Sequence, residues 1–273
     1  MSAWDGRLNV VAYDEVEAMS NYPTQAELAS YRGERLRRYE PHVRLFAELG
    51  VPAGGLRIVD VGSGSSAFLY ALERAGMLRE GLGIELSTTR HAFAERWREE
   101  ERFERVTNVR ADFTRVGLEP SSYDRVTAID ETYLYLAPQD ATYPARLFSV
   151  AYDALVTGGM LVLDFRNDMP VVKTLPPRGR EFQVDLPETN AFETATYRQI
   201  PSPDGRLIRN ESRYVGRDGT VREKVEITEV CDVRTLTDAV SGVGFESVTT
   251  YGDLSRSPFE ADDSPRAVIV ARK

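Results

Sequence analysis

Residues 57–68 read RIVDVGSGSSAF, an apolar run that leads into Gly62-Ser63-Gly64. The spacing Gly-x-Gly-x-x-Ala after an apolar strand is typical of a turn that brings backbone N–H groups and a helix N-terminus against a nucleotide-like ligand. In dinucleotide-binding proteins the ligand at this turn is an anionic pyrophosphate. Asp60, two residues before the first glycine, would face a like charge there. The segment therefore favours a nucleotide-like ligand that is positively charged near Asp60.

The composition narrows the class of protein. Acidic residues outnumber basic ones, 43 to 34, so the overall field disfavours nucleic acid as a partner. The single cysteine, Cys231, forms no internal disulfide, and no Cys/His cluster suggests a metal site. Neither a leader-like segment nor an uninterrupted apolar run of membrane-spanning length is present. We expect a cytoplasmic protein that acts on a small molecule, with no membrane and no metal.

Five short apolar runs alternate with helical or loop-like segments. This alternation predicts an α/β fold, a doubly wound parallel sheet with helices on both faces. The stretch 24–49 predicts two helices that are interrupted at Pro41, and Gly158-Gly159 is expected to end a helix before the fifth strand. The five expected strands are 56–61, 82–86, 106–111, 123–130 and 158–165.

The pattern becomes strand-like after Asp168. Asp-Gly pairs at 204–205 and 218–219 are strong hairpin signals, so we expect an antiparallel β insertion after strand five. A helix near 234–245 and strands in 246–254 and 266–273 follow. The expected domains are an N-terminal helical lid segment (1–50), a Rossmann-like domain (51–168 and 232–273) and an insertion covering the acceptor site (169–231). Edge strands of the insertion could pair between subunits in a homodimer.

Three carboxylates at strand ends suggest the identity of the cofactor. Asp60 suits the ammonium group and the positive sulfonium of S-adenosylmethionine. Glu85 ends the second strand, where a carboxylate can accept hydrogen bonds from both ribose hydroxyls. Asp112 follows the third strand and could accept a hydrogen bond from the adenine amino group. Because NAD sites also use a carboxylate for the ribose, Glu85 by itself leaves an NAD-linked dehydrogenase open.

These motifs, in this order, resemble the class I S-adenosylmethionine-dependent methyltransferases. The matching segments are VDVGSGSSAF, GIELS, RADF, YDRVTAIDETYLYL and GGMLVLDF, although Ser66 stands where the family often has a glycine. The resemblance implies a seven-stranded Rossmann-like sheet with an antiparallel last strand, and the layout is most similar to glycine and amino-sugar N-methyltransferases. The cofactor-binding residues it implies are Asp60, Gly62, Ser63, Gly64, Glu85, Leu86, Asp112, Phe113 and Asp130.

The segment after the fourth strand is where this family places the methyl acceptor. Two carboxylates and two tyrosines there could hold a cationic amine or guanidinium group. We expect Asp130, Glu131 and Tyr133 to act in catalysis, and Glu131, Tyr135, Arg166 and Asn167 to bind the substrate. Asp164 could also line the acceptor pocket. Tyr13, Tyr31, Arg32 and Arg35 could close over the carboxylate of the cofactor.

The expected activity is N-methylation of an amine or guanidine on a small metabolite such as an amino sugar, an amino acid or a natural-product precursor. A hydroxyl acceptor usually needs a stronger base, and no histidine falls in the segments after strands four and five. His42 on an N-terminal helix could still reach the pocket. The alternatives are O- or C-methylation of a natural-product intermediate, or a protein that binds the cofactor or its product S-adenosylhomocysteine without catalysis.

Overall fold

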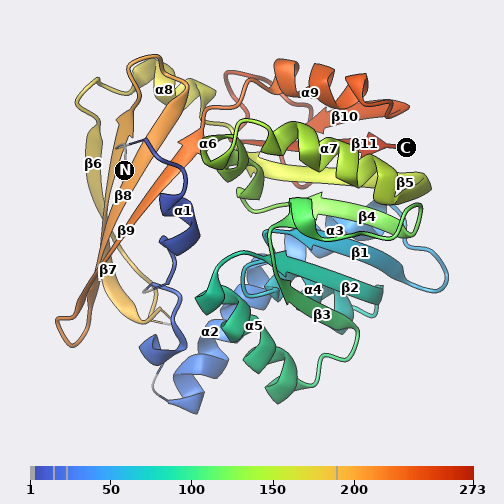
Figure 1. The fold of residues 1–273 in the computed structure, drawn as a ribbon. Coiled ribbons are helices and arrows are strands. Elements are labelled where there is room, and N and C mark those ends of the chain that lie inside the picture. Colours follow the sequence, from blue (N-terminus) through green and yellow to red (C-terminus); the bar gives the residue numbers. More distant parts are fainter. Residues whose placement is uncertain (1–3, 15, 23, 189) are drawn as a thin grey trace.

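The computed structural model describes residues 4–14, 16–22, 24–188 and 190–273. Its larger sheet has seven strands in the order β10-β11-β5-β4-β1-β2-β3, and β11 runs antiparallel to both of its neighbours (Figure 1). This confirms the predicted sheet and its antiparallel last strand. The strands are β1 (Leu56–Val61), β2 (Leu78–Glu85), β3 (Val106–Arg110), β4 (Tyr123–Ala128), β5 (Leu155–Arg166), β10 (Ser247–Tyr251) and β11 (Arg266–Arg272).

Both faces of this sheet are covered by helices. Neighbouring residues of β1 point to opposite faces, so Ile58 belongs to one apolar cluster and Val59 to the other. One cluster includes side chains of α2, α3, α4 and α5, and the other includes side chains of α6, α7 and α9. Burial on both faces explains why the strands are almost continuously apolar.

The helices are short and mostly end where the sequence predicts. Thr24 and Glu27 form a reciprocal cap at the start of α2, and Pro41 lies in the first turn of α3, where a missing N–H costs nothing. The α-helices are α1 (Leu8–Val11), α2 (Gln25–Arg38), α3 (Glu40–Glu48), α4 (Ala67–Arg74), α5 (Thr88–Glu101), α6 (Leu136–Gln139), α7 (Tyr143–Ala154), α8 (Met169–Thr174) and α9 (Val233–Gly242). The 3₁₀ turns are η1 (Met19–Asn21), η2 (Phe113–Arg115) and η3 (Thr132–Tyr135).

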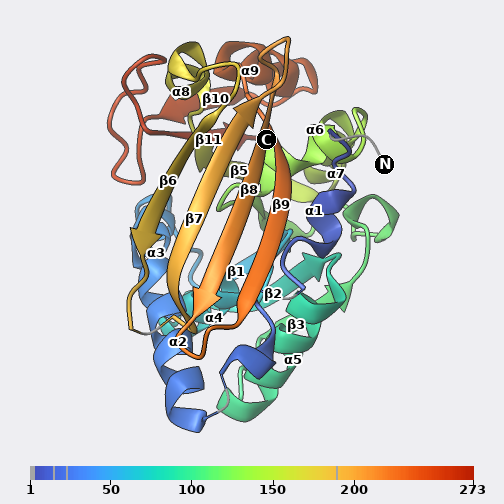
Figure 2. The same ribbon diagram turned by 90° about the vertical axis from the view of Figure 1, so that its left-hand side faces the viewer.

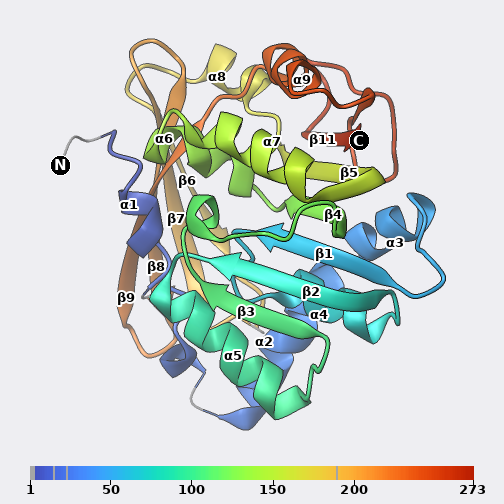
Figure 3. The same ribbon diagram turned by 45° about the vertical axis from the view of Figure 1, so that its right-hand side comes forward.

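A second sheet confirms the predicted antiparallel insertion. It consists of β6 (Arg180–Asp185), β7 (Phe192–Pro201), β8 (Leu207–Gly216) and β9 (Val221–Glu229), joined in that order. Both Asp-Gly pairs lie between consecutive strands, as expected. Figures 2 and 3 show this sheet standing beside the carboxyl ends of the parallel strands, with α1 alongside β9.

The prediction that Gly158-Gly159 ends a helix is wrong. Helix α7 ends at Ala154, and both glycines lie within β5. Gly158 has a φ of +77°, and its N–H donates to the carbonyl of Lys273. A Cβ at Gly159 would lie 2.8 Å from the carbonyl oxygen of Val156. The glycines therefore permit a bend and a close backbone approach at the start of the strand.

Candidate active site

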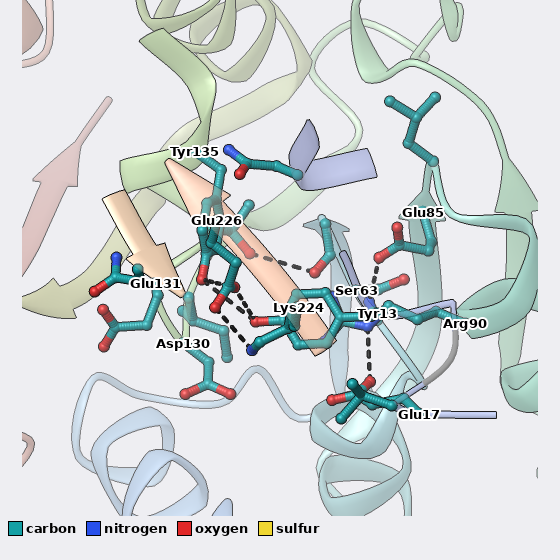
Figure 4. Close-up of a pocket in the computed structure, with 18 of the residues that line it drawn as sticks. Tyr13, Glu17, Ser63, Glu85, Arg90, Asp130, Glu131, Tyr135, Lys224 and Glu226 are labelled. Carbon is teal, nitrogen blue, oxygen red and sulfur yellow. Dashed lines mark hydrogen bonds and ion pairs between the residues drawn. The ribbon is translucent and has the colours of Figure 1, made fainter. Parts of the chain in front are cut away.

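A cavity of about 630 Å³ lies between the two sheets (Figure 4). Its floor is formed by residues at the carboxyl ends of β1, β2 and β4, and its opposite wall by the insertion. Side chains of the N-terminal segment, including Tyr13 and Glu17, close one side. The volume is within the range of small-molecule and cofactor sites, and the position is the one where doubly wound folds bind ligands.

The glycine-rich turn is held in a conformation that only glycine adopts without strain. Gly62 and Gly64 have φ values of +68° and +57°. A Cβ at Gly62 would lie 2.5 Å from the methyl carbon of Thr132, so the turn and the segment after β4 are in close contact. The backbone of Gly62, Ser63 and Gly64 lines the cavity directly.

Asp60 is a buried carboxyl group at the cavity floor. It is 2 % exposed, and its Oδ1 accepts a hydrogen bond of 2.6 Å from the hydroxyl of Thr127. Within the described ranges no lysine, arginine or histidine forms an ion pair with it. Burial raises the pKa of Asp60 to about 7. A buried carboxyl group without a cationic partner fits a ligand that brings its own positive charge.

Glu85 fixes the glycine-rich turn from the end of β2. Its Oε2 accepts a hydrogen bond from the N–H of Gly64, and its Oε1 accepts one from the N–H of Ser87, both at 2.8 Å. The carboxylate is 7 % exposed and lines the cavity. Because each carboxylate oxygen has more than one lone pair, Glu85 can still accept hydrogen bonds from a diol.

Asp112, Phe113 and Leu86 follow β3 and β2 and all three line the cavity. Asp112 caps η2 by accepting from the N–H of Thr114, and it also accepts a hydrogen bond of 2.7 Å from the phenol of Tyr143. Phe113 is buried against Tyr143, while Leu86 is 39 % exposed and lines the cavity. A carboxylate and two apolar side chains in the lining of one cavity suit a planar ring with a polar edge.

Asp130 and Glu131 form a strained turn directly after β4. Their φ values are +50° and +78°, a region that costs energy for residues other than glycine and is common at functional sites. Asp164 holds the turn: its carbonyl accepts from the N–H of Glu131, and its carboxylate accepts from the N–H of Asp130.

The two carboxyl groups of this turn have opposite electrostatic environments. Asp130 pairs with Arg38 at 2.7 Å and accepts from the phenol of Tyr39 at 3.0 Å. Burial opposes its charge, but the guanidinium groups of Arg38 and Arg35 outweigh it and hold the pKa of Asp130 below its usual range. Burial raises the pKa of Glu131 to about 7 although Arg166 lies 3.0 Å away. Asp130 is thus a fixed charge, and Glu131 can exchange a proton near neutral pH.

The comparisons with known proteins agree with this architecture. Residues 58–159 match the family model described as a methyltransferase domain. Residues 58–159 therefore form a methyltransferase domain, and the fold of the chain is that of the class I S-adenosylmethionine-dependent methyltransferases. No curated protein matches the chain in sequence.

Solved structures of methyltransferases share the fold at low sequence identity. The CcbJ methyltransferase from Streptomyces caelestis has a TM-score of 0.69 and 19 % identity over 85 % of this chain and 88 % of its own. An amino pentose methyltransferase from Micromonospora echinaspora, involved in calicheamicin biosynthesis, has a TM-score of 0.62 and 18 % identity over 92 % and 98 %. The glycopeptide N-methyltransferase MtfA has a TM-score of 0.52 and 16 % identity over 85 % and 92 %.

Three of the expected acceptor-site residues do not line the cavity of the methyltransferase. Tyr133 is packed in the core between Phe148 and Phe165, because the 3₁₀ turn η3 directs it under the sheet and not toward the insertion. Asn167 donates hydrogen bonds to the carbonyls of Ala261 and Ser264 and so anchors the loop before β11. Asp164 is fully buried behind the Asp130–Glu131 turn. We therefore correct the expectation of catalytic or substrate contact for all three.

Only some of the expected residues of the N-terminal helices line the cavity. Tyr31 and Arg35 line the cavity, whereas Arg32 is buried against Phe93 and Trp97 and pairs with Glu100. His42 lies outside the cavity lining and makes a 2.8 Å contact with Asp164.

The sequence suggested Tyr13 and Tyr135 but not the charged cavity residues Glu17, Arg90, Lys224 and Glu226. The phenols of Tyr13 and Tyr135 both donate to Oε1 of Glu226, and Lys224 pairs with the other oxygen at 2.7 Å (Figure 4). The guanidinium of Arg90 lies 4.0 Å from the centre of the Tyr13 ring and pairs with Glu17 at 2.8 Å. One pattern in the sequence could have indicated Lys224 and Glu226. They are two residues apart on a strand, so these opposite charges share one face of it.

Within the described ranges, no helix has the length and apolar character needed to cross a bilayer. The same ranges contain no group of three or more histidine, cysteine, aspartate or glutamate side chains arranged to hold a metal ion.

Proposed function

We propose that this methyltransferase N-methylates an amine or guanidine group on a small metabolite of the natural-product type. The observation that carries the proposal is Glu131, a buried carboxyl group at the cavity whose pKa is about 7. An amine must lose a proton to become a nucleophile, and a base that titrates near neutral pH is suited to receive it.

The cavity residues offer a group for each part of S-adenosylmethionine. Asp60 would bind the ammonium group, Glu85 the ribose hydroxyls, and Asp112 the adenine amino group with Leu86 and Phe113 against the ring. Gly62, Ser63 and Gly64 would contact the cofactor through their backbone. Arg35 would bind the carboxylate, since it lines the cavity and its buried Nε atom has no hydrogen-bond partner among the described residues.

The remaining residues would position the acceptor. When bound, the cofactor supplies an electrophilic methyl group on a sulfonium. Glu131 would hold the acceptor nitrogen and receive its proton, with Tyr135 beside it, while Arg166 keeps Glu131 in place through their 3.0 Å ion pair. Asp130, bound to Arg38, would supply negative charge to the pocket without changing its own protonation. Orienting the acceptor in this way is a large part of what a displacement reaction needs.

The segments around the cavity would keep water out. The N-terminal segment (1–50) serves as a lid and the insertion (169–231) as a cover, since both contribute cavity-lining side chains. Two of the structural relatives, the amino pentose methyltransferase and the glycopeptide N-methyltransferase, support an acceptor of the natural-product type. O-methylation is less favoured, because His42 is bonded to Asp164 and does not line the cavity.

The test is a methyl-transfer assay with labelled cofactor across matched amine and hydroxyl acceptors. We expect methylated product with amine acceptors. In the wild type, kcat/KM should rise with pH around pH 7 as Glu131 loses its proton, and Glu131→Gln should abolish this rise. The control is Glu119→Gln, an exposed carboxylate outside the cavity. Turnover restricted to hydroxyl acceptors would contradict N-methylation, and unchanged activity of Glu131→Gln would contradict the role of Glu131.

A further inference from the structure

The face of the insertion that looks into the cavity carries its side chains in register. Phe182, Tyr197, Ser212 and Lys224 are directly paired across β6, β7, β8 and β9, and all four line the cavity. Phe182 and Tyr197 are in ring contact, with centroids 5.5 Å apart and planes inclined by 32°. Directly paired residues share one face of a sheet. The insertion thus presents an aromatic strip that continues to the cation of Lys224.

A strip of amide side chains runs beside the aromatic strip. Gln199 and Asn210 are paired across β7 and β8 and line the cavity. Arg180 donates to Oε1 of Gln199, Nε2 of Gln199 donates to Asn210 at 3.1 Å, and Asn210 donates to Thr228 at 3.2 Å. The chain of hydrogen bonds fixes the orientation of both amides, so their remaining donors and acceptors have defined directions.

The aromatic and amide strips lie on a different wall of the cavity from the residues proposed to bind the cofactor. The cofactor-fitting carboxylates lie at the ends of β1, β2 and β3, whereas the strips lie on the insertion. Phe182 sits on β6, the edge strand, and is 42 % exposed. Because Phe182 also lines the cavity and contacts the ring of Tyr197, its exposed apolar surface is open to a ligand there.

The charges of this wall are largely compensated. Lys224 is 9 % exposed and pairs with Glu226, and its Nζ lies 4.1 Å from the centre of the Tyr13 ring. Among the described cavity-lining residues of the insertion, the buried cation Lys224 is already paired, so a ligand with multiple negative charges would find no free buried cation on this wall. An uncharged ring that offers an apolar face and hydrogen-bonding groups at its edge fits the two strips better.

We infer that the aromatic and amide strips form a second acceptor subsite, which binds an additional uncharged ring joined to the unit that carries the amine. The inference rests on the proposed function and extends it: the preferred acceptor is an amine on a ring-bearing conjugate and not a free small amine. The ring would pack on Phe182 and Tyr197 while Gln199 and Asn210 bond its polar edge. It follows that the reaction that attaches the ring precedes methylation.

The test compares two acceptors that share one amine, glucosamine and its phenyl glycoside, with glycine as a ring-free acceptor. We expect kcat/KM for the phenyl glycoside to exceed that for glucosamine about tenfold and to fall by about that factor in Phe182→Ala. The matched control is Val221→Ala, which removes an exposed apolar side chain of the same sheet outside the cavity. Equal kcat/KM for the two sugars, or an equal loss for all acceptors in Phe182→Ala, overturns the subsite.

A binding measurement separates this inference from the proposed function. Saturation-transfer NMR of the phenyl glycoside is recorded with protein loaded with S-adenosylhomocysteine. Phe182-dependent binding without methyl transfer supports the subsite and contradicts the proposed N-methylation of this class of amine. Absence of both turnover and Phe182-dependent binding overturns the subsite.

Discussion

The phenol of Tyr135 donates a 2.7 Å hydrogen bond to Oε1 of Glu226 and joins the turn after β4 to strand β9. Tyr13 donates to the same oxygen from the N-terminal segment, and Lys224 pairs with the other. Burial opposes the charge of Glu226, but the ammonium of Lys224 and the two phenols lower its pKa to about 2. One carboxylate therefore connects three segments that are distant in sequence.

Removal of this carboxylate should destabilise the protein strongly. Glu226→Ala leaves the buried ammonium of Lys224 without its partner and two phenols without their acceptor. Loss of one member of a buried ion pair typically costs about 3–5 kcal/mol. We expect a loss of this order in the free energy of unfolding, measured by urea denaturation followed by circular dichroism. Glu223→Ala, an exposed carboxylate on the same strand, should change it little, and equal losses in both variants would contradict the interpretation.

The affinity for S-adenosylmethionine should depend on pH through Asp60. The pKa of Asp60 is about 7 in the unliganded protein because of burial, so the carboxyl is protonated below that pH. Ammonium binding requires the carboxylate, so affinity should fall about tenfold per pH unit below 7 and level off above about 8. Isothermal titration calorimetry from pH 5.5 to 8.5 measures the affinity. Asp60→Asn should bind more weakly and lose the dependence, and a profile identical to wild type would refute the assignment.

The same shift predicts the sign of a stability effect. The pKa of Asp60 is higher in the folded protein than in the unfolded chain, where it is about 3.9. Between these two values the folded state holds more protons, so the contribution of Asp60 to the free energy of unfolding decreases as pH rises from about 4 to about 7. The free energy of unfolding of Asp60→Asn relative to wild type, measured by denaturation without cofactor, should therefore increase from pH 5 to pH 7, and a decrease would contradict the raised pKa of Asp60.

The sequence predicted the cofactor side of the site because its residues are encoded locally. Asp60 and Gly62 are two positions apart on one strand and turn, and Glu85 ends the next strand. The carboxyl ends of parallel strands meet at one edge, so position in sequence fixes position in space. The structure places these residues around one cavity, although their contacts with the cofactor remain a prediction.

The acceptor side depends on how distant segments pack. Tyr133 and Tyr135 are both in η3, and only the placement of α7 and of the insertion decides that Tyr133 is core and Tyr135 faces the cavity. Tyr13 and Glu226 come from opposite ends of the chain. No periodicity or spacing rule relates such positions, so the cluster could be found only in three dimensions.

Close packing at the glycine-rich turn should make Gly62→Ala lower stability and cofactor affinity much more than Gly76→Ala, a substitution at a glycine with nearly the same φ. Gly62 and Gly76 have φ values of +68° and +69°, so a Cβ strains both equally. At Gly62 the new methyl group would also lie 2.5 Å from Thr132, whereas at Gly76 nothing lies within 4 Å. We expect Gly76→Ala to lower stability by about 1 kcal/mol and to retain cofactor affinity. Gly62→Ala should lose more stability and most of the affinity, and equal effects in thermal unfolding and calorimetry would exclude this contact as the cause.

Arg35 should contribute to cofactor affinity through its position on α2. The side chain lines the cavity, its guanidinium lies 5.8 Å from the centre of the Tyr39 ring, and its Nε has no hydrogen-bond partner in the part of the chain that the structure describes. A buried donor without a partner is costly until a ligand supplies an acceptor, and a carboxylate gives a charge-assisted bond. Arg35→Ala should weaken binding of S-adenosylhomocysteine, which keeps the carboxylate but lacks the sulfonium, about tenfold or more.

Arg37, two residues further along α2, is exposed and does not line the cavity, so Arg37→Ala is the matched control. The two variants have the same net charge, and a difference between them therefore reports the local contact and not the overall field. The measurement should be repeated with 5′-methylthioadenosine, which lacks the amino-acid portion. Arg35→Ala should leave that affinity unchanged, because in the proposed site Glu85 and Asp112 would hold the nucleoside. An equal loss for both ligands would show that Arg35 acts on the shape of the cavity and not on the carboxylate.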